Sequence, residues 1–200
     1  MTIRPQLALT LISTFLLSFS TTSFADETPT GTESKKLTEL TLLPTIHRNH
    51  LKSSFYNLKR LKSVMRDIKP EIVCSEITPP SLKAHDEGKK DRRLSVFPEY
   101  IDVILPLRKE LKYKVIPCSA WSKEVNFQTV GVKKMTASHY ENIAKALDNV
   151  KGEGKKVLIT FGGGHIDGLL KHLRQRKDIK IIDYRPTLEK LRKEQAKAGS

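Results

Sequence analysis

The sequence predicts a single α/β domain in which a largely parallel β-sheet is covered by helices. Short apolar runs rich in β-branched residues alternate with amphipathic segments along the chain, which is typical of this class. The length of 200 residues and the hydrophobic content of 38% suit one core. The sequence contains no internal repeat and no low-complexity block that would indicate a solenoid or a disordered chain.

The first half of this domain opens with the run 37–46 (LTELTLLPTI), which is predicted as a strand. A helix is predicted over 53–68, and Pro70 ends it. Its apolar residues recur at helical spacing: Leu58, Leu61, Met65 and Ile68. The run 71–77 (EIVCSEI) is predicted as the second strand, and the polar segment 78–93 as a loop.

The second half repeats the alternation. Pro98 opens a helix, since proline is tolerated in a first helical turn. The predicted helices are 98–111, 136–150 and 165–176, and the predicted strands are 114–118, 156–161 and 179–184. Because the helices separate consecutive strands, the strands are expected to run parallel, with polar groups gathered at their carboxyl ends.

The two ends of the chain are expected to lie outside this domain. Residues 1–25 have a positive start at Arg4, an uncharged apolar run and small residues before Asp26, which predicts a signal peptide cleaved between Ala25 and Asp26. The mature protein would then be periplasmic or secreted. Residues 26–36 are predicted as a linker, 37–185 as the α/β domain, and 186–200 as a charged C-terminal helix or tail.

The chain is strongly basic, with a formal net charge of +14. Such an excess can indicate nucleic-acid binding, but the positive residues are spread over several segments without a nucleic-acid motif. The signal peptide holds one charged residue, so the excess belongs to the mature domain. We expect it to concern an anionic envelope surface or substrate, and we expect no specific nucleic-acid partner.

Three residues at the carboxyl ends of predicted strands form a candidate metal site. His47 follows the first strand, Glu76 lies near the end of the second, and His165 follows the Gly162-Gly163-Gly164 turn after the fourth. Two imidazoles and a carboxylate suit a divalent Zn, Mn or Fe ion with an open position for water or substrate. The alternative is that these are hydrogen-bonded polar residues without a metal.

The glycine turn is the most specific local motif. Three successive glycines permit a tight turn and close backbone approach, and the helix that follows offers free N–H groups to an anion. We therefore assign Gly162, Gly163 and Gly164 as candidate substrate-binding residues. Neither a Walker loop nor a complete dinucleotide-binding fingerprint is present. A plain turn that packs the helix on the sheet is an equally good explanation.

Three segments resemble the TraB/GumN–TIKI superfamily, which is related to the ChaN-like and erythromycin-esterase-like proteins. They are Pro44-Thr45-Ile46-His47, the run 69–76 (KPEIVCSE) and the run 162–169 (GGGHIDGL). The resemblance implies an α/β fold and, in some members, metal-dependent hydrolysis of peptides or esters. It also implies that His47, Glu76 and His165 form the catalytic and metal-binding site.

The alternative function is a non-catalytic envelope protein that binds a peptide, an anionic glycan or a haem-like iron ligand on the same scaffold. The basic surface favours it, as does Pro44, which stands where the family has glycine. His50 is expected in a helix N-terminal turn, and His139 as a structural, half-buried residue. Cys74 and Cys118 are predicted either to form a disulfide or to remain two buried thiols.

Overall fold

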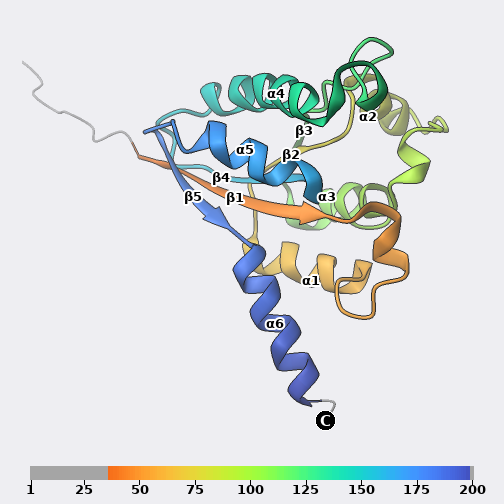
Figure 1. The fold of residues 1–200 in the computed structure, drawn as a ribbon, viewed down its shortest axis with the longest axis vertical. Coiled ribbons are helices and arrows are strands. Elements are labelled where there is room, and N and C mark those ends of the chain that lie inside the picture. Colours follow the sequence, from red (N-terminus) through yellow and green to blue (C-terminus); the bar gives the residue numbers. More distant parts are fainter. Residues whose placement is uncertain (1–35, 199–200) are drawn as a thin grey trace, which may run out of the picture. The chain divides into compact units, whose positions relative to one another are not determined.

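A computed structural model describes residues 36–198; the predicted signal peptide and most of the predicted linker lie outside the described residues. The described chain forms a five-stranded sheet in the order β3-β2-β4-β1-β5, and every pairing is parallel (Figure 1). The strands are β1 (Thr38–Thr45), β2 (Ile72–Ser75), β3 (Lys114–Pro117), β4 (Lys156–Gly162) and β5 (Ile179–Asp183). The predicted layered α/β class is therefore confirmed.

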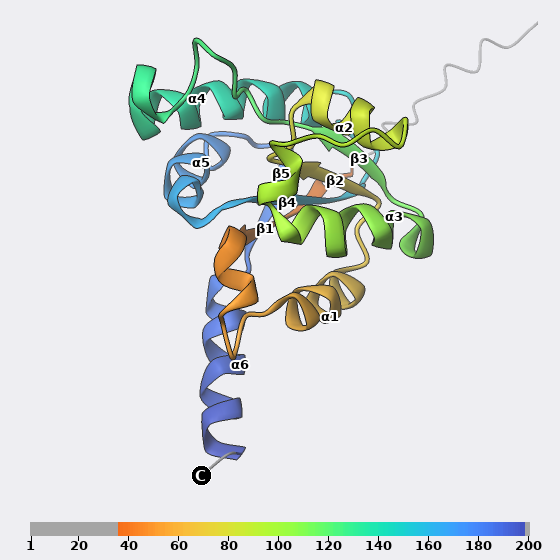
Figure 2. The ribbon, with the colours of Figure 1, turned by 90° about the vertical axis from the view of Figure 1, so that its right-hand side faces the viewer.

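Helices cover both faces of the sheet, as the turned view makes clear (Figure 2). One face packs against α1 (Leu58–Ile68), the π-helix Glu99–Ile104 and its continuation α3 (Leu105–Leu111). The other face packs against α4 (Phe127–Asp148) and α5 (Ile166–Leu173). Successive leucines of β1, such as Leu42 and Leu43, belong to different cores, because successive side chains of a strand point to opposite faces of the sheet.

The strand register determines which residues meet at the carboxyl edge. Thr45 at the end of β1 lies opposite Gly162, and Ser75 at the end of β2 lies opposite Thr160. The loops that leave β1, β2 and β4 therefore begin beside one another. In parallel sheets this edge is where ligands bind.

Two predicted loops contain helix instead. The segment 78–93 includes α2 (Pro79–Asp86), which begins where the Thr78 side chain accepts the Ser81 N–H and proline fills the first turn. Helix α4 begins at Phe127, well before the predicted start at 136, because Asn126 caps it. Gly131 breaks its helical geometry with φ 70° and ψ 165°. Helix α6 (Arg185–Ala198) ends the described chain.

Cys74 and Cys118 form a disulfide, with Cα atoms 5.7 Å apart. Of the two alternatives left open by the sequence, the structure has the bonded one. Both cysteines are buried, and the bond joins β2 to the end of β3 next to the carboxyl edge. Within residues 36–198, no helix combines the length and the apolar content needed to cross a membrane.

Candidate metal centre

His47 occupies a strained backbone position directly after β1. Its φ of 50° lies in the left-handed region, which a residue with a Cβ adopts at a cost of about 1 kcal/mol or more. Its Nδ1 lies 2.7 Å from Oε1 of Glu99, a carboxylate buried in the π-helix. Because a carboxylate accepts, the hydrogen is on Nδ1, and Nε2 carries the lone pair into the site.

Glu76 is held immediately after β2. Its backbone N–H donates to Thr160, and its Oε2 accepts the Gly162 N–H at 2.7 Å. The side chain is only 7% exposed. Burial raises the pKa of this carboxyl, against the opposing effects of the Gly162 N–H and of His47. The effect of burial on this pKa therefore outweighs the stabilisation of the charged form by the Gly162 N–H and His47.

His165 reaches Glu76 from the other side. Its Nδ1 lies 2.7 Å from the hydroxyl of Thr136, which itself donates to the Val132 carbonyl. The Thr136 oxygen therefore accepts from Nδ1–H, and Nε2 is left with its lone pair facing Oε1 of Glu76 at 3.7 Å. Burial, together with the nearby His47, lowers the pKa of His165.

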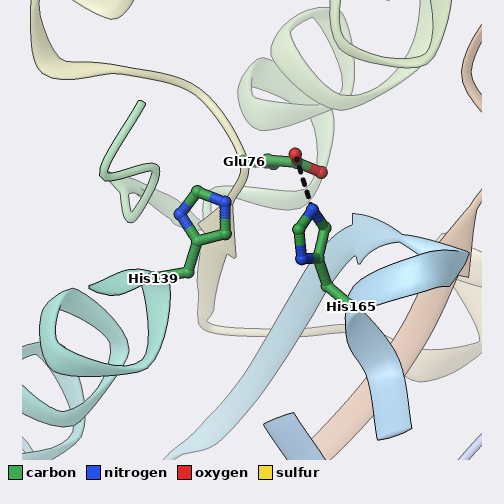
Figure 3. A group of neighbouring side chains, drawn as sticks. All are labelled: Glu76, His139 and His165. Carbon is green, nitrogen blue, oxygen red and sulfur yellow. Dashed lines mark ion pairs between the residues drawn. The ribbon is translucent and has the colours of Figure 1, made fainter. Parts of the chain in front are cut away.

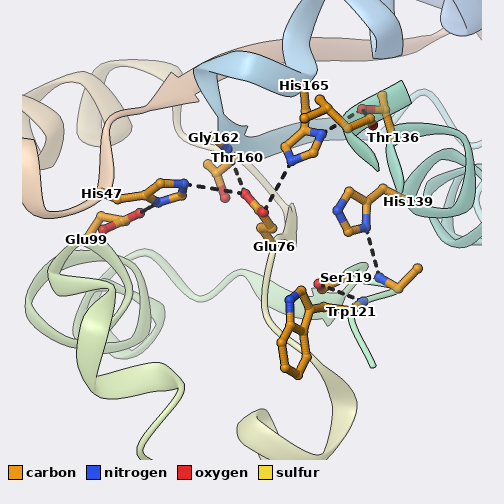
Figure 4. Close-up of polar contacts among 12 residues, drawn as sticks. His47, Glu76, Glu99, Ser119, Trp121, Thr136, His139, Thr160, Gly162 and His165 are labelled. Atoms are coloured by element: carbon orange, nitrogen blue, oxygen red, sulfur yellow. Dashed lines mark hydrogen bonds and ion pairs between the residues drawn. The ribbon is translucent and has the colours of Figure 1, made fainter. Parts of the chain in front are cut away.

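The three residues singled out in the sequence thus converge (Figure 4). The His47 Nε2 lies 4.0 Å from Oε2 of Glu76, so each carboxylate oxygen faces one imidazole. Burial of His47 alone would lower its pKa, but the hydrogen bond to Glu99 and the charges of Glu76 and Glu99 raise it. Positive charge is therefore favoured between His47 and Glu76, whether a proton or a cation supplies it.

His139 is the site residue that sequence reasoning placed wrongly. It was expected to be a half-buried structural residue, yet it is fully buried and faces Glu76 and His165 (Figure 3). Glu76, His139 and His165 each offer a ligand atom within 4.8 Å of the others, a group that could hold a metal ion. The signal available was its helical spacing with Ile143, which indicated burial but not the end of the sheet it faces.

The hydrogen bonds of His139 favour a role as an N–H donor and not as a metal ligand. Its Nδ1 accepts the Ala120 N–H at 2.9 Å, so in the neutral ring the hydrogen is on Nε2. This Nε2 is buried and has no hydrogen-bond partner among the described residues. Burial, with a smaller effect of His165, lowers the pKa of His139 to about 3, which keeps the ring neutral. His139 thus presents an N–H donor, whereas His47 and His165 present lone pairs.

A divalent ion could bridge Glu76 and either facing imidazole, although the group whose ligand atoms all lie within 4.8 Å of one another is Glu76, His139 and His165, without His47. Metal–nitrogen and metal–oxygen bonds of about 2.1 Å can span gaps up to about 4.2 Å between two ligand atoms. The gaps of 3.7 Å and 4.0 Å at Glu76 fall below that limit. Both imidazoles also have the outer hydrogen-bond partners, Glu99 and Thr136, that orient metal ligands.

The glycine turn contributes space more than flexibility. A Cβ on Gly162 would lie 2.5 Å from the Nε2 of His47, so only glycine leaves room for the imidazole. None of Gly162, Gly163 and Gly164 has a positive φ. The Gly162 N–H is already bonded to Glu76, so it is not free for a substrate anion. All three line a surface hollow of about 350 Å³ together with His47 and His165.

The remaining histidine near the site is structural. His50 is buried, its Nδ1 donates to the Tyr56 carbonyl and its Nε2 accepts the Ile46 N–H. Both ring nitrogens are therefore occupied by the backbone. His50 shapes the loop after β1 and offers nothing to a metal.

Comparison with known proteins assigns no family to this arrangement. The resemblance to the TraB/GumN–TIKI proteins rests on the three sequence segments described above. Any function must therefore be argued from the geometry of His47, Glu76, His139 and His165. No protein-family profile, no curated protein and no solved structure matches this chain.

Proposed function

We propose that the protein is an exported metal-dependent hydrolase of the TraB/GumN type that cleaves a peptide or ester bond. One observation carries the proposal: the lone pairs of His47 and His165 face the two oxygens of the buried Glu76 carboxylate. Lone pairs that face a carboxylate are not attracted to it unless positive charge lies between them, and either a proton on His47 or a bound cation would supply that charge.

The ligand roles follow from the hydrogen bonds. His47 would bind the ion through Nε2, while its Nδ1 is hydrogen-bonded to Glu99. His165 would also bind through Nε2, while its Nδ1 is hydrogen-bonded to Thr136. Glu76 would be the third ligand or the base that removes a proton from the attacking water. When bound, the ion would supply Lewis acidity toward water and toward a carbonyl oxygen.

Besides the ion, hydrolysis requires proton transfer and stabilisation of the oxygen that becomes negative, and side chains of this protein can supply both. Water adds to the carbonyl carbon, the bond to the leaving oxygen or nitrogen breaks, and the proton removed from water passes to that leaving atom. The His139 Nε2–H is buried, unpartnered and neutral, and it can donate to an oxygen that becomes negative during this step. Its Ala120 hydrogen bond fixes the ring orientation in advance.

The test is a metal and activity assay on the mature domain. We expect about one equivalent of Zn, Mn or Fe by elemental analysis, together with hydrolysis of p-nitrophenyl esters or model peptides that chelation abolishes and the metal restores. His47→Ala and His165→Ala should each weaken metal binding about a hundredfold or more. His85→Ala, a histidine in α2 away from the site, is the matched control.

Two results would contradict the proposal. One is a purified domain that holds no metal and gains no thermal stability when metal is added. The other is equal metal affinity in the His47→Ala, His165→Ala and His85→Ala proteins. Ligand binding without hydrolysis by the metal-loaded wild type, unchanged in the two site variants, would favour the non-catalytic envelope protein.

A further inference from the structure

A second cavity, of about 450 Å³, begins at Glu76 and extends away from the two metal-facing imidazoles. We call it the Trp121 pocket. Its walls are mostly apolar and include Ile77, Leu94, Val96, Phe97, Tyr100 and Trp121. This volume lies in the range of small-molecule sites, roughly 300–1,000 Å³. The candidate metal centre uses only one of the residues that line it, Glu76.

Two arginines line the same pocket. Arg92 and Arg93 are exposed, and neither forms an ion pair with any residue in the range 36–198. The Arg93 guanidinium lies 4.2 Å from the centre of the Trp121 ring. Guanidinium groups that stack on an aromatic ring keep their N–H donors free at the edge, where a carboxylate can accept them.

The pocket is also joined to the metal-facing residues through packing. The Phe97 ring contacts the His47 imidazole edge-on, with centroids 4.8 Å apart, and the Tyr100 hydroxyl accepts the Glu76 backbone N–H. Figure 4 places Trp121 on the side of Glu76 that is away from His165. A ligand in the pocket would therefore end beside the Glu76 carboxylate.

Charge sets the direction in which a ligand would lie. Among the described residues that line the pocket, Glu76 is the only acidic one, and it would repel an anionic group at its own end. Arg92 and Arg93 would attract such a group instead. An elongated ligand with an apolar body and one anionic end satisfies both conditions.

We propose that the substrate is a small carboxylate-bearing amphiphile. Its acyl or aryl body fills the Trp121 pocket, its carboxylate pairs with Arg92 and Arg93, and its ester or amide bond lies at Glu76. The placement of the cleaved bond rests on the hydrolase function proposed above. The binding of the amphiphile itself requires no metal.

Trp121 makes the binding step directly measurable, because it is the only tryptophan in the sequence. The experiment titrates decanoate into the metal-free mature domain while tryptophan emission is recorded, with calorimetry as the second readout. Decanol serves as the uncharged probe of the same chain length. The variants are Arg92→Gln, Arg93→Gln and, as a matched exposed arginine that does not line the pocket, Arg174→Gln at the C-terminal end of α5.

We expect decanoate to change the emission saturably and to bind about tenfold more tightly than decanol. Arg92→Gln and Arg93→Gln should each weaken decanoate about tenfold without affecting decanol, whereas Arg174→Gln should bind like the wild type. Equal affinity for decanoate and decanol, or equal loss in all three variants, would overturn the inference. Since no metal is present, failure of the hydrolase proposal would leave this result unchanged.

Discussion

Glu71 and Glu76 lie just beyond opposite ends of β2 and show how differently the two edges of the sheet are built. Each accepts a backbone N–H from β4: Glu71 from Lys156 at 3.0 Å and Glu76 from Gly162 at 2.7 Å. Glu71 is half-exposed and also pairs with Lys155, and these hydrogen bonds lower its pKa. Glu76 is buried, no lysine or arginine among residues 36–198 pairs with it, and burial raises its pKa.

The same contrast extends to other polar groups. Five buried side-chain atoms have no hydrogen-bond partner within residues 36–198: Thr45 Oγ1, Ser75 Oγ, Thr160 Oγ1, Glu99 Oε2 and His139 Nε2. The three Ser and Thr atoms lie at or near the ends of β1, β2 and β4. The Glu99 and His139 atoms belong to residues that support or face the candidate metal ligands. The amino edge contributes to stability, whereas the carboxyl edge keeps polar groups unpartnered at a cost that a bound ion and substrate would offset.

The strongest test of this comparison replaces one carboxylate at each edge. Glu76→Gln should lower metal affinity at least a hundredfold and hydrolysis about a thousandfold, because the only anionic group between the imidazoles is lost. The same change removes a buried charge and should raise the free energy of unfolding of the metal-free protein by about 0.5–2 kcal/mol. Calorimetric metal titration and urea unfolding measure the two effects.

Glu71→Gln is the matched control. It removes an equal charge next to the other end of β2 but should leave metal affinity and activity unchanged. If Glu71→Gln impaired metal binding as much as Glu76→Gln, the assignment of separate roles to the two edges would be wrong.

The disulfide supports the carboxyl edge. Cys74 lies two residues before Glu76, and Cys118 lies two residues before Ala120, whose N–H orients His139. The chain-entropy model assigns about 4 kcal/mol to closing a loop of this length. Replacing both cysteines by alanine should therefore lower the free energy of unfolding by about that amount in urea denaturation. Dithiothreitol should destabilise the wild type and leave the double variant unaffected. A urea midpoint of the wild type that reductant does not change would exclude a stabilising role of the disulfide.

Gly162→Ala tests the room left for His47. The new Cβ would lie 2.5 Å from the imidazole Nε2, and the Glu99 hydrogen bond prevents the ring from moving freely. The backbone itself accepts alanine, since φ is −51°. We expect metal affinity to fall about 10–100-fold in a zinc titration, the loss typical of misoriented ligands.

Gly164→Ala is the control for the neighbouring glycine. Its Cβ would meet nothing within 4 Å, so metal affinity should match the wild type. Equal losses in the two alanine variants would indicate that the turn's flexibility matters, and not the space beside His47.

The sequence predicted the sheet well, because strand and helix periodicity is a local property. It also predicted that His47, Glu76 and His165 would meet, since the carboxyl ends of parallel strands share one edge. Helix α2 was missed because two prolines and a polar composition resemble a loop, although Thr78 followed by proline is a helix start.

The roles of the supporting residues were beyond sequence reasoning. Glu99 and Thr136 act through single hydrogen bonds to the imidazoles, and those depend on how the π-helix and α4 pack across the sheet. The orientation of His139 depends on one backbone N–H in the loop after β3. No spacing in the chain encodes such contacts, because each joins elements that are distant in sequence.

The smallest expected effect is the pH dependence of stability at the amino edge. The folded-state pKa of Glu71 is below its ordinary value, so its contribution is present above the ordinary carboxyl range and is lost as pH falls through the folded pKa. Solvent screening keeps this contribution well below 1 kcal/mol. The stability lost in Glu71→Gln should therefore be measurable at pH 7 and vanish in urea titrations once the pH lies below the folded-state pKa of Glu71. The metal-free Glu76→Gln protein should instead be more stable than the wild type, and this gain should grow as pH rises, because the pKa of Glu76 is raised. If both variants were destabilised, or both stabilised, the contrast between the two edges would be wrong.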